Sequence, residues 1–494
     1  MEETRVLAFD IGASSGRAML GIYDGKTINY NEIHRFSNDP VMVRGTLYWD
    51  VLRLFYEIKQ GILKAKKFGE VSSIGVDTWG VDFGLLDKEG NLLENPIHYR
   101  DSRTLGMLAK SFDFVNEKEF YKITGNQFME INTVFQLLSL SLKRKELFGN
   151  ADTILMMPDL LNYMLTGVKA SEYSIASTTQ LLDAKNRIWS EEIIDALTLP
   201  KSLFTKIVPS GTPIGDLSKD ICTELGVNTC KVIAVAGHDT QSAMVAVPSP
   251  VDDFIFISCG TWSLFGTELL DPLINEDTFR CNITNEGGFG NKISFLKNII
   301  GLWLIQESKR QWSKEGKEYD FSELEEIAGQ SKPFKCFIDP DANDFITTGD
   351  IPKRIQEYSK RTNQEVPETV AEITRCIYES LALKYRMTLE EIKKCTKKEY
   401  SSIHMVGGGT KSKLLCQFTA DACNLEVIAG PVEATVLGNI AVQVLALGYI
   451  KDISEVREVI SKDSNISKYE PVDARLWDEA YERFKAIKEG GQHA

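Results

Sequence analysis

Residues 6–21 read VLAFDIGASSGRAMLG, an apolar run that ends at an acid and passes through small polar residues into a second apolar run. Short apolar runs that stop abruptly are typical of strands buried on both faces. Glycine and serine between two such runs predict a tight turn. The sequence therefore predicts a strand from Arg5, a turn over residues 12–16 and a returning strand that ends near Gly21.

The same order of elements recurs in the second half of the chain. Residues 253–266 read DFIFISCGTWSLFG, so a strand again meets a turn of glycine and hydroxyl residues, with Ser258 in the place of Asp10. Two such hairpins predict an internal duplication. Residues 247–253 read VPSPVDD, and their two prolines predict a linker. We expect an N-terminal domain at 1–247, a C-terminal domain at 253–450, and a helical tail at 451–494 packed on the second domain.

Further strands and helices alternate along the chain, which predicts an α/β fold. The other short apolar runs each end at a glycine or an aspartate, and helical patterns lie between several of them. The expected strands are Ile74–Val76, Val232–Ala236 and Ile403–Val406, and the expected helices are Trp49–Lys66, Ala371–Lys394 and Lys411–Cys423.

The first turn has the residue types of a phosphate-binding loop. Small side chains at Ala13–Gly16 allow backbone N–H groups to approach a phosphate, and the Ser14 and Ser15 hydroxyls can also donate. Arg17 offers a fixed fork of donors, and Asp10 is placed to hold Mg²⁺ through water. Taken alone, the same residues also fit a plain hairpin with a glycine–serine turn.

Two further glycine turns extend the phosphate-binding pattern. Gly260–Ser263 repeats the first loop without its acid, although Trp262 favours core packing. Gly407–Gly409 lies between an expected strand and an expected helix, where the helix N-terminus adds a positive partial charge. A triple glycine is also compatible with a flexible turn.

Two polar clusters follow expected strands, and ligands gather at the carboxyl ends of strands in open α/β sheets. In the cluster 237–241, Asp239 can accept a proton from a hydroxyl, while His238 and Thr240 can hold neighbouring hydroxyls; a helix N-cap is the alternative. In the cluster 77–82, Thr78 can bind a hydroxyl and the Trp79 indole can pack on a sugar face; a turn between two strands is the alternative.

Composition limits the class of protein. The chain has 494 residues and a formal net charge of −14, which disfavours nucleic acid or an anionic membrane as a partner. Its nine cysteines show no metal-binding spacing, which favours reduced thiols. The N-terminus shows no secretion signal and no apolar run is long enough for a membrane span, so we expect a cytoplasmic protein, a monomer or small homo-oligomer.

These motifs, taken in order, resemble those of the FGGY family of carbohydrate kinases. The matching segments cover nearly the whole chain, and only their combination is specific. They are 10–17, 77–83, 99–103, 157–159, 165–167, 238–240, 260–264, 282–288, 297–299, 301–304, 406–409 and 430–434.

The resemblance implies two ribonuclease-H-like domains of the actin-type ATPase class with a cleft between them. It implies ATP and Mg²⁺ as cofactors and L-rhamnulose as the ketose, phosphorylated at C1. The family's nucleotide-binding positions fall on Ala13, Ser14, Ser15, Gly16, Arg17, Thr261, Gln306 and Gly408. Its sugar-binding positions fall on Gly80, His238, Asp239, Thr240 and Asn298, with Asp239 as the base. Gly237 and Cys259 depart from the family pattern beside these positions.

Three other functions remain compatible with parts of the pattern. A related kinase would act on L-fuculose, L-ribulose or D-xylulose, and sequence logic does not rank these sugars. An actin- or chaperone-type ATPase would hydrolyse ATP without responding to sugar. A sugar-responsive repressor would need a DNA-binding helical domain, for which we expect no room before residue 5.

Overall fold

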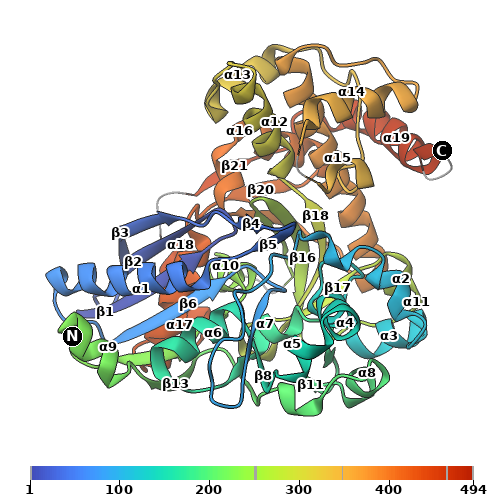
Figure 1. Ribbon diagram of the computed structural model, residues 1–494. Coiled ribbons are helices and arrows are strands. Elements are labelled where there is room, and N and C mark those ends of the chain that lie inside the picture. Colours follow the sequence, from blue (N-terminus) through green and yellow to red (C-terminus); the bar gives the residue numbers. More distant parts are fainter. Residues whose placement is uncertain (1–2, 250–252, 348, 463–465, 492–494) are drawn as a thin grey trace. The chain divides into compact units, whose positions relative to one another are not determined.

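The computed structural model describes residues 3–249, 253–347, 349–462 and 466–491. The chain divides into two compact units, each of which contains segments that are distant in sequence (Figure 1). Unit 1 comprises residues 1–250, 268–295 and 434–462, and unit 2 comprises 251–267, 296–433 and 463–494.

These units differ from the contiguous domains expected from the sequence. Residues 268–295 and 434–450 belong to unit 1, although they lie inside the expected second domain. The expected tail is also divided, because α18 (Ile453–Ser461) belongs to unit 1 and α19 (Ala474–Gly491) to unit 2. Within the expected linker, residues 250–252 lie outside the described residues.

Unit 1 is built on a six-stranded sheet with the order β13-β14-β6-β1-β2-β3. Strand β1 pairs antiparallel with β2 and parallel with β6, which in turn pairs parallel with β14. The sheet strands are β1 (Thr4–Ile11), β2 (Ser15–Tyr23), β3 (Ile28–Ser37), β6 (Ser73–Thr78), β13 (Thr212–Asp216) and β14 (Lys231–Ala234). The expected first hairpin and the strands after it are therefore confirmed.

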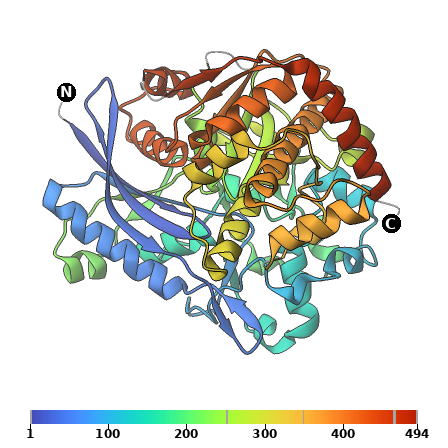
Figure 2. The ribbon, with the colours of Figure 1, turned by 90° about the horizontal axis from the view of Figure 1, so that it is seen from above.

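The two faces of this sheet are covered by different helices, as alternation of side chains along a strand requires. Phe9 and Val76 point into a core shared with α1 (Val51–Ala65), where Gly61 allows close approach to Phe9. On the opposite face, Gly75 packs against Asn439 of α17 (Ala434–Ala446). Figure 2 shows the long strands β1–β3, in dark blue, beside α1.

The rest of unit 1 consists of short strands and helices. The strands are β4 (Val41–Val43), β5 (Thr46–Tyr48), β7 (Phe83–Leu86), β8 (Thr153–Met156), β9 (Ser171–Glu172), β10 (Leu182–Asp183), β11 (Ile188–Trp189), β12 (Ile207–Val208) and β17 (Thr284–Gly287). The helices are α2 (Met107–Ser111), α3 (Glu117–Thr124), α4 (Thr133–Lys143), α5 (Lys145–Gly149), α6 (Met157–Thr166), α7 (Tyr173–Ser177), α8 (Glu191–Ala196), α9 (Lys219–Leu225), α10 (Asp239–Val245) and α11 (Glu276–Arg280).

Unit 2 repeats the strand order of unit 1, which supports the expected duplication. Its strands follow the order β18-β16-β15-β19-β20-β21, with β15 antiparallel to β16 and parallel to β19. The strands are β15 (Ile255–Cys259), β19 (Ser402–Val406), β20 (Glu426–Ala429), β21 (Ser467–Tyr469) and the larger parts of β16 (Trp262–Leu269) and β18 (Ile293–Ile300).

Two helices of unit 2 correspond to the helical patterns predicted at residues 371–394 and 411–423. The helices of this unit are α12 (Trp303–Lys314), α13 (Phe321–Gln330), α14 (Ile351–Arg361), α15 (Val370–Thr396), α16 (Lys413–Cys423) and α19. Helix α15 begins at a capping box in which Thr369 and Glu372 bind each other's backbone N–H. Over the described residues no helix combines the length and apolarity that a membrane crossing needs, and no disulfide bond forms.

Candidate active site

Three neighbouring parallel strands of unit 1 end at one edge of the sheet and bring the first predicted residues together. Asp10 on β1 is the register partner of Asp77 on β6. The Thr78 N–H donates to the Gly237 carbonyl at 2.9 Å, and Thr78 pairs with His238 in an isolated bridge. Asp239 follows immediately and begins α10. The polar residues at the ends of β1, β6 and β14 therefore converge, as the position of strand ends predicts.

Asp10 and Arg17 form an ion pair across the first hairpin. The Arg17 Nη2 donates to Asp10 Oδ2 at 2.5 Å, and both side chains are less than one-fifth exposed. The two residues are register partners in the β1–β2 pairing, which places both side chains on the same face. The ion pair therefore lies where the loop joins the two strands.

The turn above this ion pair is held by backbone contacts that leave donors available. The Gly12 N–H donates to the Ser15 carbonyl at 2.9 Å, and Asn38 donates to the Gly12 carbonyl. Within the described part of the chain, the Ala13 and Ser14 N–H groups donate to no protein acceptor. Gly16 lies against the Phe36 ring, where a Cβ would collide. The turn thus fits the predicted phosphate-binding loop.

Two carboxyl groups at the strand ends, Asp77 and Asp239, have raised pKa values, chiefly because they are buried. Burial raises the pKa of Asp77 strongly, the Asp10 carboxylate raises it further, and the Asn439 side chain opposes the shift by donating to Asp77 Oδ2 at 2.6 Å. Burial also raises the pKa of Asp239, His238 opposes that shift, and Asp10 adds to it. Mutual repulsion of this kind marks a position where a bound cation would be stabilised.

The Asp239 side chain combines a fixed orientation with access from outside. Its Oδ1 accepts from the Thr240 N–H at 2.6 Å, so the carboxylate lies at the first turn of α10, and the side chain is 32% exposed. The N-cap position belongs to His238, whose side chain makes no cap hydrogen bond. Asp239 is therefore oriented by the helix start and remains reachable by a ligand.

Gly80 lies beside this turn, whereas Thr78 and Trp79 face the protein interior. A Cβ at Gly80 would come within 3.3 Å of His238 Nε2, so the glycine leaves space next to the imidazole. The Thr78 hydroxyl donates to the Trp79 carbonyl, and the buried Trp79 indole donates to Asp82 at 3.0 Å. The groups that were expected to contact a sugar through Thr78 and Trp79 thus have protein partners.

In unit 2, the second glycine hairpin and the triple glycine pack against each other. Gly409 lies on Cys259, where any larger residue would collide with the thiol, and Gly408 is the exposed member with open space beside its Cα. The Thr261 hydroxyl donates to Gln306 on α12 at 3.3 Å. Thr261 and Gln306 are therefore in contact, and Gly408 faces solvent in the adjacent loop.

Asn298, the remaining predicted sugar contact, is half-buried on β18. It lies in the part of β18 that belongs to unit 2, in the middle of the strand. Its assignment to the sugar therefore remains a prediction from the sequence.

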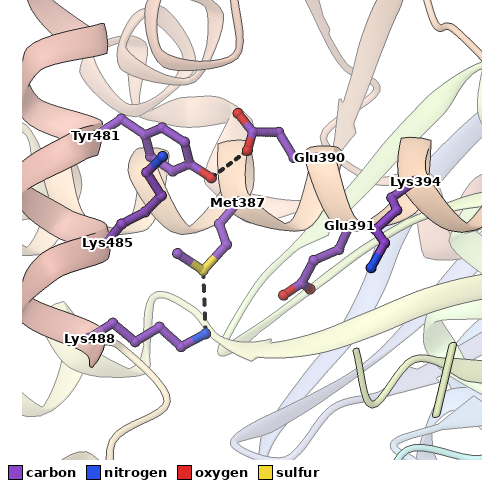
Figure 3. Close-up of a pocket in the computed structure, with 7 residues that line it drawn as sticks. All are labelled: Met387, Glu390, Glu391, Lys394, Tyr481, Lys485 and Lys488. Atoms are coloured by element: carbon purple, nitrogen blue, oxygen red, sulfur yellow. Dashed lines mark hydrogen bonds between the residues drawn. The ribbon is translucent and has the colours of Figure 1, made fainter. Parts of the chain in front are cut away.

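A pocket of about 440 Å³ lies between α15 and α19 in unit 2 and contains none of the predicted residues (Figure 3). Its acids are engaged, because Glu390 accepts from the Tyr481 hydroxyl at 2.8 Å and Glu391 from Lys297 at 2.6 Å. The charged lining therefore consists largely of internal pairs. The lining residues are Met387, Glu390, Glu391, Lys394, Tyr481, Lys485 and Lys488.

Three buried polar residues contact the unit 1 cluster although the sequence indicated no role for them. Glu172 contacts the backbone of the 237–239 turn, Glu286 contacts His238, and Asn439 binds Asp77. Glu286 lay in a matched segment, but no role was derived for it. Glu172 ends a two-residue strand and Asn439 lies on a mostly apolar helix, so neither had a periodic signal that pointed to this site.

Comparison with known proteins gives matches over almost the whole chain. The N-terminal domain model of the FGGY family of carbohydrate kinases matches residues 5–246, and the C-terminal domain model matches 255–447. A rhamnulokinase from Bacteroides thetaiotaomicron is 41% identical over 97% of this chain and 98% of its own. A rhamnulokinase from Halalkalibacterium halodurans is 40% identical over 94% of this chain and 99% of its own.

Solved structures show the same fold at low sequence identity. A ligand-bound xylulose kinase from Lactobacillus acidophilus has a TM-score of 0.82, with 17% identity over 99% of this chain and 100% of its own. A glycerol kinase from Plasmodium falciparum with ADP has a TM-score of 0.75, with 16% identity over 99% of this chain and 98% of its own.

Proposed function

The chain belongs to the FGGY family of carbohydrate kinases, and on this premise we propose that it transfers the γ-phosphate of ATP to the C1 hydroxyl of L-rhamnulose. The product would be L-rhamnulose 1-phosphate, formed in the cytoplasm during rhamnose catabolism. The choice of ketose is supported by near-full-length relatives that are named rhamnulokinases. A kinase for L-fuculose, L-ribulose or D-xylulose is the alternative.

One observation carries the catalytic part of the proposal: an accessible Asp239 carboxylate stands at the strand edge that also presents Asp10 and the 12–17 loop. Phosphoryl transfer depends mainly on positioning and charge neutralisation. We assign the 13–17 loop to the phosphates, and Thr261, Gln306 and Gly408 to further nucleotide contacts. Gly80, His238, Thr240 and Asn298 are assigned to the sugar.

Asp239 is assigned the role of the base, which accepts the proton of the attacking hydroxyl. Its raised pKa brings it nearer to the working pH, where proton acceptance is most effective. Arg17 neutralises charge on phosphate oxygens, and the Ala13 and Ser14 N–H groups donate to them. These steps need no covalent intermediate on the protein.

Mg²⁺ would fit beside Asp10, because the acids at this edge repel one another and a cation would relieve that repulsion. The described residues contain no group of three metal-ligating side chains, so Asp10 would act as one protein ligand, through water. When bound, the ion would supply charge neutralisation for the phosphates. Asp10 would orient it and Arg17 would fix the Asp10 carboxylate.

The test is a panel of ketoses with ATP and Mg²⁺ in an assay coupled to ADP formation. L-Rhamnulose is expected to give the highest kcat/KM, with L-fuculose, L-ribulose and D-xylulose well below it. A higher value for another ketose would move the substrate assignment to that sugar. ADP formation that is independent of every ketose would favour a non-kinase ATPase and overturn the proposal.

A further inference from the structure

We propose that Glu172 and Glu286 are positioning residues for Asp239, holding the 237–239 turn from two sides, Glu172 through the backbone and Glu286 through the His238 ring. The inference rests on the proposed function, because it takes Asp239 as the base. Neither glutamate faces the open side of the turn, since Glu172 is 1% exposed and Glu286 is 4% exposed. They would therefore act through the turn and not by contact with a substrate.

Glu172 receives more hydrogen bonds than a helix cap requires. As the N-cap of α7 it accepts from the Ser174 N–H at 2.9 Å and the Ile175 N–H at 3.1 Å. It also accepts from the Gly237 N–H at 3.0 Å and from the Ser210 hydroxyl at 2.5 Å. The Gly237 contact comes from a distant segment of the chain, so this carboxylate fixes the start of the turn as well as its own helix.

A second path leads from Glu172 to the backbone of His238. The Ser174 hydroxyl donates to Glu172 Oε2 at 2.6 Å and accepts from the His238 N–H at 3.3 Å. Two successive N–H groups of the turn, at 237 and 238, are thus tied to one carboxylate. Burial raises the pKa of Glu172, and its hydrogen-bond donors oppose that shift. This carboxylate therefore acts on the turn through hydrogen bonds.

Glu286, on β17, faces the side chain of the same turn at ion-pair distance. Its Oε2 lies 3.1 Å from His238 Nδ1, and His238 Nε2 lies 3.4 Å from Asp239 Oδ1. The imidazole therefore stands between two carboxylates. Burial acts to lower the pKa of His238, but Glu286, Asp239 and Glu172 together raise it, which favours the charged ring beside the base.

Gln241 fixes the orientation of Glu286 in turn. The Gln241 amide nitrogen donates to Glu286 Oε2 at 3.2 Å, while the Gln241 amide oxygen accepts from the Ser294 hydroxyl at 2.7 Å. Both ends of the Gln241 amide are satisfied, so its direction is determined. Gln241 lies on α10 with Asp239, which joins Glu286 to the helix that carries the base.

The two glutamates converge on a turn whose placement decides catalysis. Displacement of a reacting group by about 1 Å can cost a rate of about 10²-fold. An amide at position 172 would present an NH₂ group to backbone donors, and an amide at 286 would remove the charge that faces His238. Both substitutions keep the shape of the side chain while weakening its hold on the turn.

The experiment compares Glu172→Gln and Glu286→Gln with Glu57→Gln, using the ketose that the wild-type enzyme phosphorylates fastest. Glu57 is the matched control, because it is a buried glutamate of the same unit that lies 2.6 Å from a histidine, His34, and is not assigned to the site. We expect kcat to fall between about 10-fold and 100-fold in Glu172→Gln and Glu286→Gln, with KM for ATP unchanged within about twofold. Glu57→Gln should lower the melting temperature and leave kcat unchanged.

Ser174→Ala provides a second variant if Glu172→Gln does not fold, because it removes only the link between Glu172 and the His238 N–H. It should lower kcat with little loss of melting temperature. Wild-type kcat in Glu286→Gln and in Ser174→Ala would overturn the inference. A loss of kcat in Glu57→Gln as large as in the other two would assign the effect to general destabilisation and would also overturn it. A wild-type enzyme that phosphorylates no ketose would instead refute the proposed function.

Discussion

Asp10 and Asp77 are register partners on the parallel strands β1 and β6, so both carboxyl groups leave the same face of the sheet at the same level. Asp77 is completely buried and its Oδ2 accepts from Asn439, whereas Asp10 is ion-paired with Arg17. Burial and the nearby Asp10 charge raise the pKa of Asp77, which favours its neutral form. The pair thus combines one carboxylate that is ion-paired with Arg17 and one buried carboxyl whose pKa is raised.

Replacing Asp239 by Asn should leave the fold intact and lower kcat by about 10² or more, because the amide cannot accept the hydroxyl proton. The carboxylate is one-third exposed, so its loss leaves no cavity in the core. The measurement is kcat in the coupled assay together with the melting temperature. Asp216→Asn, at an exposed acid of the same unit, is the control and should behave as the wild type. Near wild-type turnover in Asp239→Asn would show that another group is the base.

Replacing Gly16 by Ala should distort the phosphate-binding turn, because the new methyl group would collide with the buried Phe36 ring. Overpacking of this kind costs about 1–3 kcal/mol and moves the backbone. We expect a lower melting temperature and a raised KM for ATP. Gly149→Ala is the control, since a Cβ there meets no atom within 4 Å. An unchanged KM for ATP in Gly16→Ala would argue against phosphate binding by this turn.

The sheet and the main turns could be predicted from the sequence because their signals are local. A buried strand that ends at an acid, followed by glycine and serine, fixes a hairpin within about a dozen residues, and both hairpins were confirmed. The expected helices near 49–66, 371–394 and 411–423 were confirmed to within two residues at each end, as α1, α15 and α16. Hydrophobic periodicity predicts the type and extent of a single helix or strand, and it predicted these elements correctly.

The parts that could not be predicted depend on contacts between distant segments. Helix α17 packs on β1 and β6 and supplies Asn439 to Asp77, yet its sequence shows only a mostly apolar helix. Residues 268–295 similarly join unit 1 and supply Glu286 to His238. The Trp79 indole N–H likewise donates to Asp82 in the interior, a partner that the local sequence does not indicate. No local pattern distinguishes these cases, because the partner is chosen by the tertiary fold.

The three glycines at 407–409 should separate structural from ligand-binding roles. A Cβ at Gly408 meets open space, whereas a Cβ at Gly409 would collide with the Cys259 thiol. Gly408→Ala should therefore fold normally and raise the KM for ATP, and Gly409→Ala should lower the melting temperature. Thermal unfolding and ATP kinetics of the two variants test this directly. If Gly408→Ala had the same KM for ATP as the wild type, the proposal that Gly408 contacts the nucleotide would be refuted.

Asp82 should make the protein less stable as the pH rises from about 4 to about 6. Its Oδ2 accepts from the Trp49 indole at 2.6 Å and the Tyr99 N–H at 3.1 Å, yet burial raises the pKa of this carboxyl to about 6. The folded state holds the proton more tightly than the unfolded state, where the pKa of Asp is about 3.9, so between these values the folded state binds more protons and stability falls with rising pH. The difference between these two pKa values corresponds to a loss of about 3 kcal/mol in the free energy of unfolding once the pH passes 6. The melting temperature, measured from pH 4.5 to 7.5, should decline more steeply in the wild type than in Asp82→Asn, which has no proton to release; equal slopes in the two proteins would contradict a raised pKa at Asp82.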